Sequence, residues 1–410
     1  MGVGVIIYVT AALFLYALVS KRLASSPISG PIVFVTLGLV GYASGILSPI
    51  AVLDSPITAL LEFTLALLLF TDASKLHLRS READMALPTR LLGIGMPLTI
   101  ALGAIVAYLV FPSVGIVGAA IIATILAPTD AALGFAVVAN PRVPIRIREA
   151  LSIESGLNDG IALPILLFLI TLAAADAGVP LWNFFVEGIG VAVPVGLVVG
   201  VGAALAIRFA VERSWIESQW VRIAMVAVAL GAYIVADHLG GSGFIAAYVA
   251  GIGFGRVLDR LESSSIDFAK LAEDLGTVLS MTSFLLFGAY LLAPNLAAFT
   301  AATVFYAVMS LTVVRMIPVA TSMIGTRLAS PTLTYLGWFG PRGLASIIFA
   351  SVLVEEAGLE QARLIVGVII VTVAASVLLH GVTAPWGANK YAAWYSRRSE
   401  ATGNSRSVDQ

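Results

Sequence analysis

The sequence predicts an all-α polytopic membrane protein from three features: its composition, its long apolar runs and the distribution of its positive charges. Of its 410 residues, 59% are hydrophobic and only 11% are charged, and the mean hydropathy is +1.00. One soluble core cannot bury that much apolar surface, so the lipid bilayer must be the solvent for most of the chain. A net charge of −1 leaves no basic face for nucleic acid, and the absence of cysteine excludes disulfides and thiolate chemistry.

Apolar runs of about 20 residues, the length that crosses a bilayer, predict thirteen transmembrane helices. They cover residues 3–20, 30–47, 56–74, 89–111, 115–138, 148–173, 182–210, 219–238, 243–257, 273–293, 297–325, 331–354 and 362–385. The first run is expected to be a retained span, because its positive pair follows it, unlike that of a signal peptide. Residues 1–395 are therefore expected to form a single transmembrane domain, and the polar residues 396–410 a disordered cytoplasmic tail.

Lysine and arginine test this count independently, because they collect in short cytoplasmic loops. They follow the odd-numbered spans, for example as Lys21 and Arg22 after the first and as Arg142, Arg146 and Arg148 after the fifth. This alternation predicts a multi-pass protein of the cell (plasma or inner) membrane, with the N-terminus outside and the C-terminus in the cytoplasm.

Two of the predicted spans carry a proline-containing interruption. The fifth contains Leu126-Ala-Pro-Thr-Asp130 and the twelfth contains Gly340-Pro-Arg-Gly343. Proline disrupts the helical ladder, and non-helical backbone at membrane depth is tolerated only where protein or a water-filled cavity covers it. The spacing predicts two six-helix repeats, residues 1–175 and 218–388, joined by a linker helix over 182–212.

Carboxylates inside spans are the candidate functional residues, because an ionised side chain at mid-bilayer costs roughly 2.5–3.5 kcal/mol. Asp130 lies in the broken fifth span, and Ser155 and Asp159 lie one helical turn apart in the sixth. If they face one another, the carboxylates, the Ser155 hydroxyl and freed carbonyls near Thr129 supply the oxygen ligands of a small hard cation. The oxygen preference of hard divalent ions is extended here to sodium by analogy. Close carboxylates oppose each other's ionisation, so the pocket holds either a cation or protons, which is the simplest mechanism for exchange.

Three motifs together resemble the monovalent cation:proton antiporter-1 family, the NhaP/NHE type of sodium/proton antiporter. They are Ala127-Pro-Thr-Asp130, Glu154-Ser155-x-x-Asn158-Asp159 and Gly340-Pro-Arg-Gly343, and the resemblance covers nearly the whole chain. It implies a thirteen-helix fold of two inverted repeats, with broken helices 5 and 12 crossing at mid-membrane. It also implies a homodimer whose core domain of broken helices moves against a dimerisation domain in alternating access. It also implies electroneutral 1:1 exchange of sodium or lithium for a proton, for sodium extrusion and pH homeostasis, because the pair in the sixth span is Asn-Asp rather than Asp-Asp.

Carried over by motif, the resemblance implies that Asp130, Asp159, Ser155 and the backbone of Thr129 bind the sodium ion. Asn158 would hold the broken helices in register.

The resemblance also implies that Glu154 is a structural acid paired with a buried arginine. Arg315 and Arg342 are the two candidates, and the resemblance slightly favours Arg315. One position departs from the family pattern: archaeal members carry glutamate in a Phe-Glu-Gly setting near the end of the third span, where this chain has Phe-Thr-Asp72. Asp72 is either a shorter substitute in the ion site or a residue of the cytoplasmic rim, which leaves the ion selectivity open.

Three rival functions remain beside the sodium/proton antiporter. A potassium/proton antiporter of the same fold would use the same ligands, since cavity size sets the selectivity. An intramembrane aspartyl protease also uses two membrane aspartates, but its Gly-x-Gly-Asp motif is absent. A passive channel would not need two interrupted helices. We therefore expect a secondary transporter rather than an enzyme, with no cofactor and with a monovalent cation and protons as its substrates.

Overall fold

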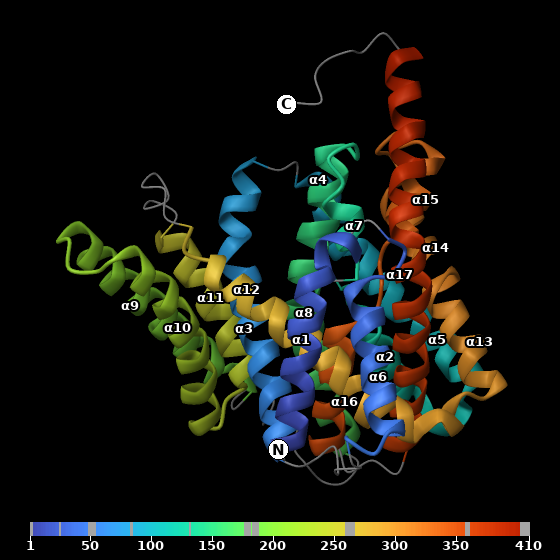
Figure 1. The fold of residues 1–410 in the computed structure, drawn as a ribbon, viewed down its shortest axis with the longest axis horizontal. Helices are drawn as coiled ribbons and strands as arrows, with labels where there is room; N and C mark the ends of the chain where they lie inside the picture. Colours follow the sequence, from blue (N-terminus) through green and yellow to red (C-terminus); the bar gives the residue numbers. More distant parts are fainter. Residues whose placement is uncertain are drawn as a thin grey trace.

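The computed structural model consists of helices joined by turns and short loops, which confirms the expected all-helical class (Figure 1). It describes residues 3–23, 26–47, 55–82, 85–130, 133–175, 182, 188–258, 267–356 and 361–401.

The first half of the chain contains ten helical elements. They are α1 (Val3–Leu23), α2 (Gly30–Ala43), α3 (Ser55–Glu82), α4 (Ala86–Arg90), η1 (Leu91–Gly95), α5 (Met96–Val110), η2 (Pro112–Val114), α6 (Gly115–Ile125), α7 (Phe135–Val138) and α8 (Ile145–Ala175). α4, η1 and α5 follow one another without a break, so they form one continuous rod.

The remaining elements follow the same pattern of long and interrupted helices. They are α9 (Ala192–Glu212), α10 (Ser218–His238), α11 (Gly243–Leu258), α12 (Lys270–Leu286), η5 (Phe287–Leu292), η6 (Ala293–Ala298), α13 (Ala301–Leu311), α14 (Val313–Ser322), α15 (Ser330–Trp338), α16 (Leu344–Glu356) and α17 (Ala362–Ala401).

Length and composition make this a multi-pass membrane protein. Within the described ranges, nine helices are long and apolar enough to cross a membrane, and four shorter apolar helices accompany them. Large apolar side chains also point outward, among them Phe14 and Leu18 of α1 and Val198 of α9. In water such a surface would be an aggregation hazard, whereas in lipid it faces its preferred solvent.

Small residues let α11 approach its neighbours closely. A methyl group at Gly200 of α9 would overlap the backbone of Ala250, and methyl groups at Gly251 and Gly255 would overlap backbone atoms of α3. In lipid there is no hydrophobic driving force between helices, so membrane helices associate through the close packing that small residues allow. Figure 1 shows the result: α9, α10 and α11 lie together on one side of α3, while α5, α13 and α17 lie on the other.

The C-terminal helix ends later than expected. α17 continues to Ala401, so residues 396–401 are helical rather than part of a disordered tail, and 402–410 lie outside the described residues. Good helix formers and the absence of a breaker explain the extension; the Ser396 hydroxyl and Arg397 Nε also donate to carbonyls one turn earlier. Within the helix expected over 182–212, α9 covers Ala192–Glu212, and residues 183–187 lie outside the described residues.

Candidate ion-binding site

The two proline-containing segments meet in the interior. Residues 126–130 after α6 and 339–343 after α15 are not helical. The Asp130 amide donates to the Pro341 carbonyl at 2.8 Å, so the two interruptions are in direct contact. Pro128 and Pro341 have no amide hydrogen to donate within a helix, and this explains why α6 and α15 each end just before its proline.

The free backbone carbonyls at and after the end of α6 accept hydrogen bonds from side chains of the other interrupted segment and of α16. The Ser346 hydroxyl donates to the Ile125 carbonyl at 2.7 Å. Arg342 Nη1 donates to the carbonyls of Ala127 and, at 3.2 Å, Pro128. The guanidinium thus places a positive charge at the negative end of the α6 dipole.

At the start of α16 the unpaired groups are backbone amides, and Asp130 supplies the acceptor for one of them. Its Oδ2 accepts the Leu344 amide hydrogen at 2.6 Å, and its Oδ1 accepts that of Leu133 at 3.2 Å. A negative charge therefore lies at the positive end of α16. Each interrupted segment supplies the charged side chain that stabilises the end of the other helix, with Arg342 serving α6 and Asp130 serving α16.

Gly343 is required by this crossing, because a methyl group there would overlap the Asp130 carboxylate. We expect Gly343→Ala to break the Asp130–Leu344 hydrogen bond and to cost roughly 1–3 kcal/mol. The measurement is the apparent melting temperature of the detergent-purified protein, which should fall by several degrees. Gly202→Ala in α9 is the matched control, since nothing lies within 4 Å of its added methyl group. Equal melting temperatures for the two variants would contradict the packing argument.

α8 holds the first interrupted segment through Thr129. Thr129 Oγ1 lies 2.9 Å from Ser155 Oγ, and it accepts a hydrogen bond from Asn158 Nδ2 at 2.7 Å. Asn158 Nδ2 also lies 3.5 Å from the Thr129 carbonyl oxygen. Because residues 155, 158 and 159 fall on neighbouring faces of one helix, the same stretch of α8 that fixes Thr129 also presents Asp159.

All five residues predicted to contact the ion border one cavity of about 90 Å³. A cavity of this size has room for water or a small cation. The lining residues are Leu65, Leu68, Asp72, Pro128, Thr129, Asp130, Ser155, Asp159, Ser280, Gly343, Leu344 and Ala345. Asp72, which the sequence assigned either to the site or to the rim, therefore borders the cavity.

Asp159 differs from Asp130 in its hydrogen bonding. Its buried Oδ1 has no hydrogen-bond partner among the residues that the structure describes. A buried carboxylate oxygen without a partner is costly, so this atom is the natural position for a proton or a cation. Within the described ranges no three acidic, histidine or cysteine side chains converge as a metal cluster. The oxygens available to a bound ion are those of the aspartates, hydroxyls and carbonyls that border the cavity.

Glu154 is paired with Arg315 rather than with Arg342. Arg315 Nη1 and Nη2 donate to Glu154 Oε1 and Oε2 at 2.5 and 2.8 Å, and both side chains are 3% exposed. A methyl group at Gly340 would overlap the Arg315 guanidinium. The ion pair therefore joins α8 and α14, and it passes directly against the interruption between α15 and α16.

Sequence reasoning missed one residue that lines the cavity and one ion pair between α3 and α12. Ser280 of α12 lines it, and its signal was a hydroxyl within the apolar run 273–293. Lys75 of α3, one turn after Asp72, forms an ion pair with Glu273 of α12. These two residues belong to spans that no motif connects, so the sequence held no sign of their contact.

Comparison with known proteins provides independent information on the fold and family. The transmembrane sodium/hydrogen exchanger family matches residues 8–390. The sodium proton antiporter MjNhaP1 from Methanocaldococcus jannaschii has a similar structure at pH 8, with a TM-score of 0.71, 18% identity, and coverage of 95% of this chain and 98% of that one. A second structure of MjNhaP1, from electron microscopy, gives a TM-score of 0.73 at 21% identity, covering 96% and 98%.

One curated relative matches a shorter stretch of this chain. The K(+)/H(+) antiporter NhaP of Alkalimonas amylolytica is 25% identical over 253 residues, which is 62% of this chain. The match spans 42% of that relative's length.

Proposed function

The chain belongs to the sodium/hydrogen exchanger family, and on that premise we propose that it is an electroneutral sodium(lithium)/proton antiporter whose ion site is the cavity between α3, α8 and the two interrupted helices. Cation/proton antiport is the activity that the family supports. The observation that carries the assignment of the site is the convergence of Asp130, Asp159, Ser155 and Thr129 on one small buried cavity at the crossing.

The proposed exchange is a competition at Asp159. Each oxygen of Asp130 already accepts one amide hydrogen, and hydrogen bonds of this kind favour the ionised carboxylate. Asp159 keeps one oxygen without a partner, so it is the group that loses a proton when the cation arrives. One proton replaced by one monovalent cation leaves the charge of the site unchanged, and this is our basis for 1:1 electroneutral stoichiometry.

The proposal extends to topology and assembly. Each of the thirteen predicted spans overlaps one of the nine long or four shorter apolar helices of the described residues, which supports our proposal of thirteen spans. We propose two inverted repeats related by the crossing of α6 and α16, an external N-terminus, a cytoplasmic C-terminus and a homodimer. The reciprocal roles of Arg342 and Asp130 support the repeats. Arg342, from the second interrupted segment, stabilises the end of α6, and Asp130, from the first, stabilises the start of α16.

Transport in proteoliposomes tests the function directly. Vesicles with a preset pH gradient receive sodium, lithium or potassium in turn, with and without a clamp on the membrane voltage. We expect sodium and lithium to collapse the gradient at rates that the clamp does not change. A rate that rises several-fold under the clamp would contradict electroneutrality, and no response to any of the three ions over a wide pH range would contradict antiport.

Potassium is the second candidate substrate, because the curated relative that matches this chain is named a K(+)/H(+) antiporter. Carboxylate and hydroxyl ligands suit either ion, and the size of the occupied cavity decides between them. Collapse of the pH gradient by potassium, but not by sodium at equal concentration, would move the assignment to this candidate.

A further inference from the structure

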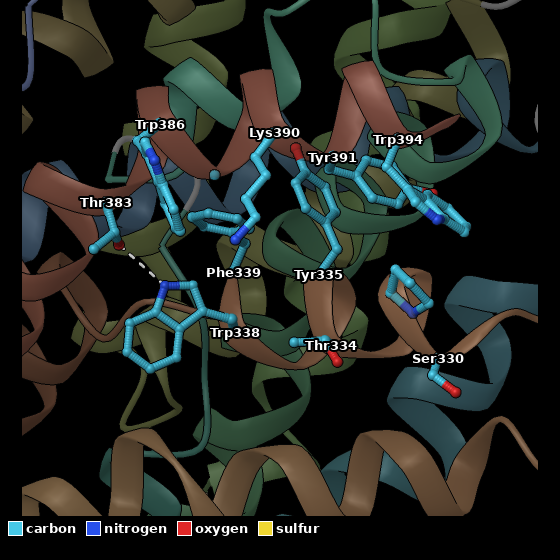
Figure 2. A pocket seen from close by; sticks show the side chains of 12 residues that line it. Ser330, Thr334, Tyr335, Trp338, Phe339, Thr383, Trp386, Lys390, Tyr391 and Trp394 are labelled. Carbon is cyan, nitrogen blue, oxygen red and sulfur yellow. Dashed lines mark hydrogen bonds between the residues drawn. The ribbon is translucent and has the colours of Figure 1, made fainter. Parts of the chain in front are cut away.

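A second and larger cavity lies away from the ion site, between α15 and the end of α17. It is a groove of about 580 Å³ whose walls are largely aromatic (Figure 2). The side chains that define it are Tyr335, Trp338, Trp386, Lys390, Tyr391 and Trp394. Of the 12 residues that line it, Lys390 alone carries a charge. The volume falls in the range of pockets that bury most of a small amphipathic ligand.

The composition of the groove is that of a membrane–water boundary. Three of the six tryptophans of the chain line it, together with two tyrosines. Tryptophan and tyrosine gather where hydrocarbon meets the lipid head groups. Along α17 the apolar residues 362–385 give way to Lys390, Arg397 and Arg398, so the groove lies at the level where the helix leaves the hydrocarbon.

The groove also carries positive charge. Figure 2 shows the Lys390 side chain reaching into it between Trp386 and Tyr391, and its Nζ lies 4.6 Å from the centre of the Trp386 ring. Within the described residues no carboxylate pairs with Lys390. Arg398 lies 5.5 Å from the ring centre of Trp394, at the end of the same wall. A cation in an apolar wall favours a ligand that joins an anionic head to an apolar body.

We propose that this groove binds one anionic phospholipid, with its phosphate at Lys390 and an acyl chain along the Trp386 and Trp338 rings. The lipid is the occupant that fits both the charge and the interfacial level of the groove. Phe339, which also lines the groove, immediately precedes Gly340. The bound lipid therefore contacts the segment that leads into the interruption between α15 and α16. This inference does not depend on which ion is transported.

Tryptophan fluorescence provides the test, because half of the tryptophans lie in the groove. The full-length protein is placed in bilayers of phosphatidylcholine, and brominated phosphatidylglycerol or brominated phosphatidylcholine is added as a quencher in increasing fraction. We expect the anionic quencher to reach half of its effect at a several-fold lower fraction. Lys390→Gln should reduce that preference about fivefold, the effect of one lysine at an anionic surface.

The controls separate this site from general attraction to charge. Lys21→Gln removes an exposed lysine at the end of α1 and should leave the preference unchanged. Since Lys390 is itself exposed, its loss leaves the fold in place, and elution as a single species by size exclusion verifies this. Equal quenching by both lipids, or an undiminished preference in Lys390→Gln, would overturn the proposal. Either result would leave antiport, which is measured separately, untouched.

Discussion

Replacing Asp159 with asparagine is expected to abolish cation-driven proton movement while leaving the protein folded. The substitution keeps the size of the side chain but removes the group that releases a proton in exchange for a cation. Because Oδ1 of Asp159 has no hydrogen-bond partner in the described structure, little native bonding is lost there. Proton flux in proteoliposomes should fall to the rate of empty vesicles, a loss of at least about 100-fold, as when an essential proton-transfer group is removed.

Asp130→Asn serves as a comparison with a different expected signature. Transport should be lost here too, but Asp130 also accepts the amide hydrogens of Leu133 and Leu344, so this variant should be less stable as well. Asp274→Asn is the neutral control, because Asp274 is an exposed partner of Lys270 on α12. Exchange retained by Asp159→Asn at near the parental rate would refute the assignment of the site.

Breaking the Glu154–Arg315 pair is expected to have the largest effect on stability. Removing one partner leaves the other charge buried and uncompensated, which costs about 3–5 kcal/mol. Glu154→Gln has a further consequence, because the Glu154 carboxylate also interacts electrostatically with the Arg342 guanidinium. Two guanidinium groups would then lose the counter-charge of Glu154, so we expect a steep fall in folded, monodisperse protein and in its melting temperature.

A double-mutant cycle separates the pair from its context. Glu154→Gln combined with Arg315→Gln should be less destabilised than the sum of the two single changes, because neither buried charge is then left alone. The exposed Arg208–Glu212 pair of α9 is the matched control, and Arg208→Gln there should change stability by no more than about 0.5 kcal/mol. Additive losses at the buried pair would show that the two residues act independently.

Local properties of the sequence were enough to predict the helices and most of the cavity. A transmembrane span can be recognised by its length and apolarity, and both are properties of the segment itself that do not depend on the segments packed against it. Asp130 and Asp159 stood out for the same reason, because a carboxylate within an apolar run must be covered by protein wherever the run packs. The helical repeat then placed Ser155 on the face of Asp159, and the structure has both beside one cavity.

What the sequence by itself determined is therefore the membrane class, the position of the apolar helices and the identity of the residues that must be buried. The tertiary structure decided which of them meet: Arg315 rather than Arg342 beside Glu154, Asp72 and Ser280 at the cavity, and Asp130 at the start of α16. Glu154 and Arg315 are 161 residues apart, and either arginine could satisfy the acid chemically. The choice depends on the packing of α8 against α14, and helix packing is set by the shapes of many side chains together rather than by any motif along the chain.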